Sequence, residues 1–125
     1  MKQIRIEQIK LIHQSLITET GGSSGVRDMG LLESAMFTPF QTFDGEALYP
    51  SVQQKASKLC TGLIQNHPFI DGNKRIGIHA MLIFLSINGI DISYTGAELI
   101  QIGLEIADGK MNDIALVKWI IQHEI

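Results

Sequence analysis

The sequence is poor in cysteine, because its 125 residues contain only Cys60. One cysteine excludes a disulfide within the chain and a zinc site built from several cysteines. Long apolar runs are also missing: the longest, from Ile76 to Ile87, is shorter than the about 20 residues that span a bilayer. The N-terminus lacks the uninterrupted apolar stretch of a secretory signal peptide. We therefore expect a cytoplasmic protein that does not interact with a membrane.

A large excess of charge of either sign is absent too. The net charge is −3 and no basic stripe runs along the chain, which argues against direct binding of nucleic acid. Apolar residues make up 45% and charged residues 18%, which is typical of a globular chain rather than a disordered one. The length fits one domain, which we expect to cover residues 1–125.

Apolar residues recur at helical spacing over most of the chain, which predicts an all-α fold of about six helices. Capping boxes mark two helix starts, at Ser51 with Gln54 and at Thr95 with Glu98. The expected helices cover about residues 4–19, 28–37, 51–67, 73–88, 95–108 and 112 onwards. The helix at 73–88 is apolar nearly all round, so we expect it to be the buried centre of the bundle.

Smaller features complete the expected fold. Residues 40–50 have no helical period and contain Asp44 followed by Gly45, which indicates an exposed loop or a small hairpin. The last helix is expected to face inward with Ile114, Val117, Ile120 and Ile121. The residues His13, Lys55, Lys58 and His123 are expected at the surface.

Polar residues of the expected central helix gather in its first turn, at Asn73, Lys74 and Arg75. A helix N-terminus already carries partial positive charge, so two cations there are unfavourable unless an anion binds. Free backbone N–H groups, the small Gly72 and the two cationic side chains together make a phosphate-binding site.

The residues just before that turn extend the same chemistry. Asp71 supplies a hard oxygen ligand of the kind that Mg²⁺ accepts beside phosphates. His67 can deprotonate a hydroxyl near neutral pH. Taken singly, each feature has a structural interpretation: a hydrogen-bonded loop histidine, a common turn or a solvated Lys74–Arg75 pair. Taken together, they indicate the transfer of part of a nucleotide to a hydroxyl.

The segment from His67 to Arg75, HPFIDGNKR, resembles the signature loop of the Fic/Doc superfamily and looks most like its death-on-curing (Doc) branch. Further similarity lies at residues 25–28, 31–35, 48–51, 84–85 and 88–89. The resemblance covers roughly residues 4–90. It implies a Fic/Doc-like bundle around the central helix, in which residues 40–50 take the place of the flap that lines up a target segment.

The resemblance also implies a role for each residue of the loop. His67 matches the catalytic base that activates a Ser, Thr or Tyr hydroxyl, and Asp71 matches the acidic residue that holds Mg²⁺. The positions matched to cofactor binding are Phe69 as core anchor, Gly72, Asn73 and Lys74 as the anion-binding turn, and Arg75 as the phosphate-binding arginine. The implied cofactors are ATP and Mg²⁺.

Two departures from the pattern concern which phosphate is transferred. Adenylyl-transferring Fic proteins usually carry Gly where this chain has Lys74, and a second Arg where it has Ile78. The Asn-Lys-Arg form resembles the Doc branch, where the nucleotide is thought to lie reversed and the γ-phosphoryl group is transferred. Many Fic proteins also carry an inhibitory helix with the motif (S/T)-x-x-x-E-(G/N). Ser15 and Glu19 match the first and fifth positions of this motif, but Thr20 stands where the motif has Gly or Asn. We therefore expect no built-in inhibitor.

The resemblance therefore implies the toxin of a type II toxin–antitoxin system, neutralised by a separate cognate antitoxin. Its expected activity is Mg·ATP-dependent phosphorylation of a Ser or Thr hydroxyl in a protein, with elongation factor Tu as the branch's substrate, which would inhibit translation. Protein adenylylation is the alternative, and a catalytically silent nucleotide-binding or interaction module is a second one.

Overall fold

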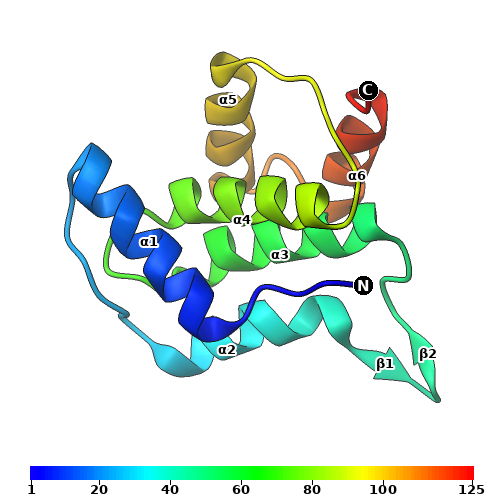
Figure 1. Cartoon of the computed structure of the whole chain (residues 1–125), viewed down its shortest axis with the longest axis horizontal. Helices are drawn as coiled ribbons and strands as arrows, with labels where there is room; N and C mark the ends of the chain where they lie inside the picture. The colour runs from blue at the N-terminus through cyan, green and yellow to red at the C-terminus, as the bar shows by residue number, and fades with distance from the viewer.

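A computed structural model describes all residues of the chain, 1–125. Its secondary structure consists of six α-helices, one 3-10 turn and two short strands (Figure 1). In chain order these are α1 (Ile6–Thr20), α2 (Met29–Phe37), η1 (Thr38–Phe40), β1 (Thr42–Phe43), β2 (Glu46–Ala47), α3 (Val52–Asn66), α4 (Asn73–Ile87), α5 (Gly96–Ala107) and α6 (Asp113–Gln122). The all-α architecture with a small hairpin is confirmed. None of the helices combines the length and apolar character needed to cross a membrane.

The helices begin where the sequence predicted. At the start of α3, the Ser51 side chain accepts from the N–H of Gln54 while the Gln54 side chain accepts from the N–H of Ser51. Thr95 and Glu98 make the same reciprocal pair at the start of α5. Asp28 caps α2 by accepting from a backbone N–H. Local sequence therefore fixes these boundaries, because each cap satisfies N–H groups that the helix itself leaves free.

Helix α4 forms the centre of the bundle, with α1, α3 and α5 packed against it. Its closest partner is α3, and Gly77 permits that approach: a Cβ atom there would lie 2.7 Å from Ile64 Cγ1 and 3.1 Å from the carbonyl oxygen of Cys60. One cluster of 21 buried apolar residues draws on all six helices. The expectation that α4 is buried all round is only partly right, since His79 and Ile87 are exposed where no neighbouring helix covers them.

The face that helix α6 turns to the core was predicted only in part. Ile120 is buried and Val117 is half-buried, as expected, but Ile114 and Ile121 are 64% and 53% exposed, and Leu116 is buried in addition. The prediction was wrong for Ile114 and Ile121 because α6 carries apolar residues on several faces, so its sequence pattern alone does not select one. Trp119 is half-buried and stacks on the ring of His123, with the centroids 4.1 Å apart.

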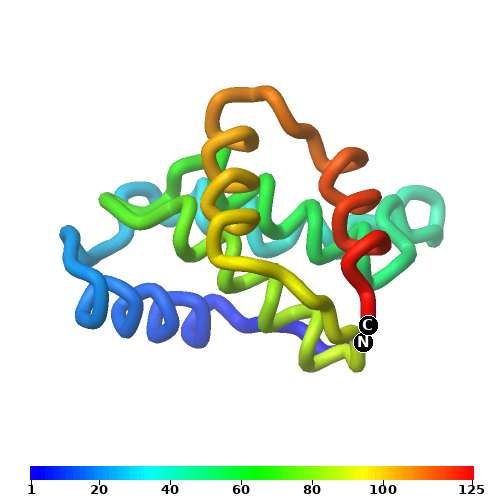
Figure 2. The backbone as a smooth tube through the Cα atoms, turned by 90° about the horizontal axis from the view of Figure 1, so that it is seen from above, coloured from blue at the N-terminus to red at the C-terminus, as the bar shows by residue number.

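The hairpin is present, but it lies away from the loop at residues 67–75. Strands β1 and β2 pair antiparallel around Asp44 and Gly45, both with positive φ, as a tight hairpin turn requires. Figure 1 and Figure 2 show the hairpin at the end of α3 opposite that loop. Fifteen helical residues of α3, about 22 Å at the usual rise, separate the two. The resemblance implied that residues 40–50 form a flap over the loop at residues 67–75. The hairpin lies too far from that loop to do so.

Candidate active site

The loop between α3 and α4 is held from outside by the segment just before α2. The side chain of Arg27 donates to the carbonyl oxygens of His67 at 2.7 Å and Asn66 at 3.1 Å. The backbone N–H of Arg27 donates to the carbonyl oxygen of Pro68 at 2.7 Å, and the N–H of Ile70 donates to that of Gly25 at 3.1 Å. Arg27 thus fixes the loop backbone rather than forming a surface salt bridge.

Asn73 holds the same loop from inside. Its Oδ1 accepts from the N–H of Phe69 at 2.9 Å, and its Nδ2 donates to the carbonyl oxygen of Phe69 at 3.0 Å. Asn73 is 4% exposed and Phe69 is 1% exposed. Both were predicted as cofactor-binding residues, and the structure places both side chains in the interior. They shape the loop from within, and of Asn73 only the backbone N–H is left for a ligand.

His13 is a residue of this site that the sequence reasoning missed. Expected at the surface, it is only 2% exposed and stacks on Phe69. Its Nε2 lies 2.7 Å from the carbonyl oxygen of Asp71. Because a carbonyl only accepts, Nε2 carries the hydrogen. The spacing gave a signal: His13 lies between Ile9 and Ile17 at intervals of four, on the buried face of α1.

Two residues bend the backbone so that the loop can turn into α4. His67 follows the last residue of α3 in the left-handed region, with φ 53° and ψ 52°. Such a conformation is uncommon for a residue with a side chain, and it is often found at functional sites. Gly72 precedes α4 with φ 77°, a conformation that glycine adopts without strain. The His67 side chain is exposed and makes no hydrogen bond within the protein.

The Asp71 carboxylate is held by backbone donors. Oδ2 accepts from the N–H of Ser23 at 3.2 Å, and Oδ1 accepts from the N–H of Gly72 at 2.8 Å. These bonds, and then the charge of Arg75 at 3.8 Å from Oδ1, lower the pKa of Asp71 below its usual value. Asp71 is therefore ionised at neutral pH, as a metal ligand must be.

Arg75 is positioned at the end of α1. Its Nη1 donates to the carbonyl oxygen of Gly21 at 2.8 Å and to the hydroxyl of Thr20. Together with the ion pair to Asp71, these contacts fix the guanidinium beside the loop. Lys74, in contrast, is exposed and forms no ion pair. Its ammonium group is thus the free cation of this turn.

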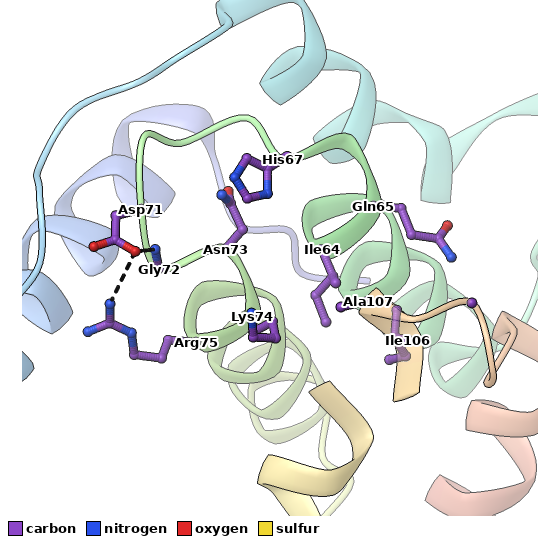
Figure 3. Close-up of a pocket in the computed structure, with 11 residues that line it drawn as sticks. Ile64, Gln65, His67, Asp71, Gly72, Asn73, Lys74, Arg75, Ile106 and Ala107 are labelled. Atoms are coloured by element: carbon purple, nitrogen blue, oxygen red, sulfur yellow. Dashed lines mark hydrogen bonds and ion pairs between the residues drawn. The ribbon is translucent and has the colours of Figure 1, made fainter. Parts of the chain in front are cut away.

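A pocket of about 520 Å³ brings most of these groups together. The polar residues that line it are Gln65, His67, Asp71, Asn73, Lys74 and Arg75, and the apolar ones are Ile64, Ile106 and Ala107. Figure 3 shows the His67 ring next to Asn73 on the side of the loop where α3 ends, and the Asp71 carboxylate on the opposite side, next to Arg75. The backbone N–H groups of residues 73–75 donate to no acceptor in the protein. The pocket therefore combines a free imidazole with an anion-binding helix start.

The chain offers one carboxylate, that of Asp71, for a metal at this pocket, since no group of three or more His, Cys, Asp or Glu side chains converges. That donor set fits Mg²⁺, which is usually held by one or two carboxylates and completes its shell with phosphate oxygens and water. Both oxygens of Asp71 retain acceptor capacity beyond their single backbone bonds. The residues present therefore suit a metal that arrives with a nucleotide.

Comparison with known proteins relates the chain to one protein family and to two named proteins. Residues 3–85, which include the whole loop, match the family model described as the Fic/DOC family. The chain is 37% identical over 95 residues to Toxin Doc of Mycolicibacterium smegmatis. This alignment covers 76% of this chain and 68% of that protein. The chain is also 26% identical over 112 residues to Protein kinase doc of Escherichia phage P1. That alignment covers 90% of this chain and 87% of that protein.

Proposed function

The chain belongs to the Fic/DOC family, and from that premise we propose that it is a Doc-type toxin that transfers the γ-phosphoryl group of ATP to a protein hydroxyl. One observation carries the proposal: the free imidazole of His67 and the free N–H groups at the start of α4 line the same pocket. An imidazole with no partner in the protein is available to a substrate, and a pure nucleotide-binding module has no need of one.

The reaction assigns one task to each group. The imidazole of His67 accepts the proton of a Ser or Thr hydroxyl in the protein substrate. The hydroxyl oxygen forms a bond to the γ-phosphorus while the bond from that phosphorus to the β–γ bridging oxygen breaks, and ADP leaves. Lys74, Arg75 and the N–H groups of the first turn of α4 bind the phosphates. Asp71 would hold Mg²⁺, which would supply positive charge beside the phosphates.

Phosphoryl transfer is favoured over adenylyl transfer by two residues. Lys74 places a side chain and a charge where adenylyl-transferring relatives usually have glycine. Ile78 leaves the second turn of α4 without the second arginine of those relatives, and its side chain is 7% exposed. The name of one relative, Protein kinase doc, points the same way. Adenylyl transfer is the alternative, and a silent nucleotide-binding module is the second.

The proposed partners follow from the Doc relatives. A toxin of this kind acts with a cognate antitoxin supplied as a separate chain, and the resemblance suggests elongation factor Tu as the protein substrate. Blocked translation is then the expected effect in a bacterial cell.

Induced expression in bacteria, with incorporation of labelled methionine as the readout, tests the proposed toxicity. We expect protein synthesis to stop with the unmodified chain and to continue with His67→Ala. The exposed Lys118 on α6, outside the pocket around His67, supplies a control, since Lys118→Ala should remain toxic. Equal inhibition by the unmodified chain and by His67→Ala would rule out His67 as the catalytic base.

A further inference from the structure

Residues 25–28, just before α2, run antiparallel to the loop that carries His67 and are hydrogen-bonded to it. We propose that the side chain of Arg27 in this segment is a positioning residue for the transfer reaction. It holds the backbone of His67 in the conformation that presents the imidazole to the pocket. The proposal rests on the proposed function and deepens it, because it adds a residue from outside the loop on which the rate of transfer depends.

The backbone of His67 has a conformation that its own sequence does not favour. Its φ of 53° and ψ of 52° lie in the left-handed region, which is uncommon for a residue with a side chain. The next residue is Pro68, and a residue before proline prefers extended backbone. A conformation of this kind persists only where the surrounding structure enforces it. The direction in which the imidazole leaves the backbone therefore depends on contacts from elsewhere.

The side chain of Arg27 supplies such contacts on both sides of His67. Its Nε donates to the carbonyl oxygen of His67 at 2.7 Å, and its Nη2 donates to the carbonyl oxygen of Asn66 at 3.1 Å. No other group in the protein donates to either oxygen. The carbonyl of Asn66 belongs to the peptide unit before the Cα atom of His67, and the carbonyl of His67 belongs to the unit after it. One guanidinium thus fixes both peptide units whose orientations define φ and ψ of His67.

Arginine suits this task better than lysine. Its guanidinium donors form a rigid planar fork, whereas lysine has one ammonium group on a flexible stem. The positive charge also lies at the C-terminal end of α3, where the free carbonyls and the helix dipole favour a cation. Arg27 does not line the pocket around His67, so its effect on the reaction passes through the backbone of His67.

Two measurements on three variants test the proposal. The first is the initial rate at which labelled γ-phosphate enters the proteins of a desalted bacterial lysate at saturating Mg·ATP, and the second is calorimetric titration of Mg·ATP binding. The variants are Arg27→Ala, Arg27→Lys and the matched control Asp28→Ala. The side chain of Asp28 accepts from the N–H of Leu31 and makes no contact with the loop. Its loss removes a helix cap, so the control shows what reduced stability alone does to the rate.

We expect Arg27→Ala to lower the rate about 100-fold, as misplacement of a reacting group does, and to leave the affinity for Mg·ATP within about twofold. Arg27→Lys keeps the charge and one donor group, so its rate should fall between those of Arg27→Ala and the unmodified chain. Asp28→Ala should transfer at the unmodified rate. An unchanged rate in Arg27→Ala, or an equal loss of rate in Asp28→Ala, would overturn the proposal.

Crystal structures of the unmodified chain and of Arg27→Ala provide a readout that does not depend on activity. We expect His67 to leave the left-handed region in the variant, and an unchanged φ would refute the assignment to Arg27 while leaving the proposed function standing. If Arg27→Ala does not fold, Arg27→Lys decides the same question, since it loses the second of the two carbonyl contacts. If the unmodified chain transfers no γ-phosphate, the proposed function fails and the positioning role falls with it.

Discussion

The buried ring of His13 lies parallel to that of Phe69, with centroids 3.8 Å apart and an interplanar angle of 11°. The same imidazole donates from Nε2 to the carbonyl oxygen of Asp71. One side chain of α1 thereby contacts the loop at its apolar anchor and at the residue proposed to hold Mg²⁺. The loop is thus positioned by a helix more than 50 residues earlier in the chain.

Replacing His13 with alanine should therefore destabilise the fold and loosen the loop. The substitution leaves a cavity against Phe69 and deprives the carbonyl of Asp71 of its donor, which together cost about 2–4 kcal/mol of unfolding free energy. Urea denaturation measures the change. Gln14→Ala, on the exposed side of the same helix, should change stability little. A His13→Ala variant as stable as the unmodified chain would show that the stack does not hold the loop.

The contact between α3 and α4 predicts a second effect on stability. Gly77→Ala places a methyl group 2.7 Å from Ile64 Cγ1 and next to backbone, so the helices must separate. Overpacking of this kind costs about 1–3 kcal/mol. Gly96→Ala is the matched control, because a Cβ atom there meets nothing within 4 Å. Thermal unfolding of the two variants should differ clearly, and equal melting temperatures would contradict the packing described for Gly77.

The pair Glu98–His123 predicts a pH dependence of stability. His123 Nε2 lies 2.7 Å from Glu98 Oε2. A hydrogen bond to the carbonyl of Trp119, followed by the bond to Glu98, raises the pKa of His123 above its ordinary 6.5. The stabilisation of the fold by protonated His123 is therefore complete below pH 6.5 and is lost as the pH rises through the raised pKa.

Glu98 behaves in the opposite sense. The N–H of Thr95, followed by the bond from His123, lowers the pKa of Glu98 below its ordinary 4.5. The stabilisation of the fold by ionised Glu98 is therefore complete above pH 4.5 and is lost as the pH falls through the lowered pKa. The pair therefore stabilises most between 4.5 and 6.5. The melting temperature of His123→Gln should fall furthest below that of the unmodified chain in this window; a gap that does not vary with pH would refute the pairing.

Much of the site could be predicted because it is local in sequence. His67, Asp71, Lys74 and Arg75 belong to one loop and one helix start, so a short segment carries them all. The helix boundaries were equally local, since each cap and its partner lie three residues apart. Such features depend on backbone geometry that neighbouring residues determine.

The rest depends on contacts between distant segments. No local pattern shows that Arg27 donates to the carbonyl of His67, or that His13 supports Asp71. Lys55 was expected in solvent, yet it is 7% exposed and donates to the carbonyl oxygen of Tyr49. The residues between β2 and α3 fold back over it, and only the tertiary structure reveals that.

The central claim is that His67 serves as the base for transfer of a γ-phosphoryl group to a protein hydroxyl. It is tested most directly with ATP labelled on either the α- or the γ-phosphate, Mg²⁺ and the proteins of a bacterial lysate, using His67→Ala as the control. We predict protein-bound label from the γ-phosphate only, and none with His67→Ala. Label from the α-phosphate, or γ-label that persists in His67→Ala, would contradict the claim.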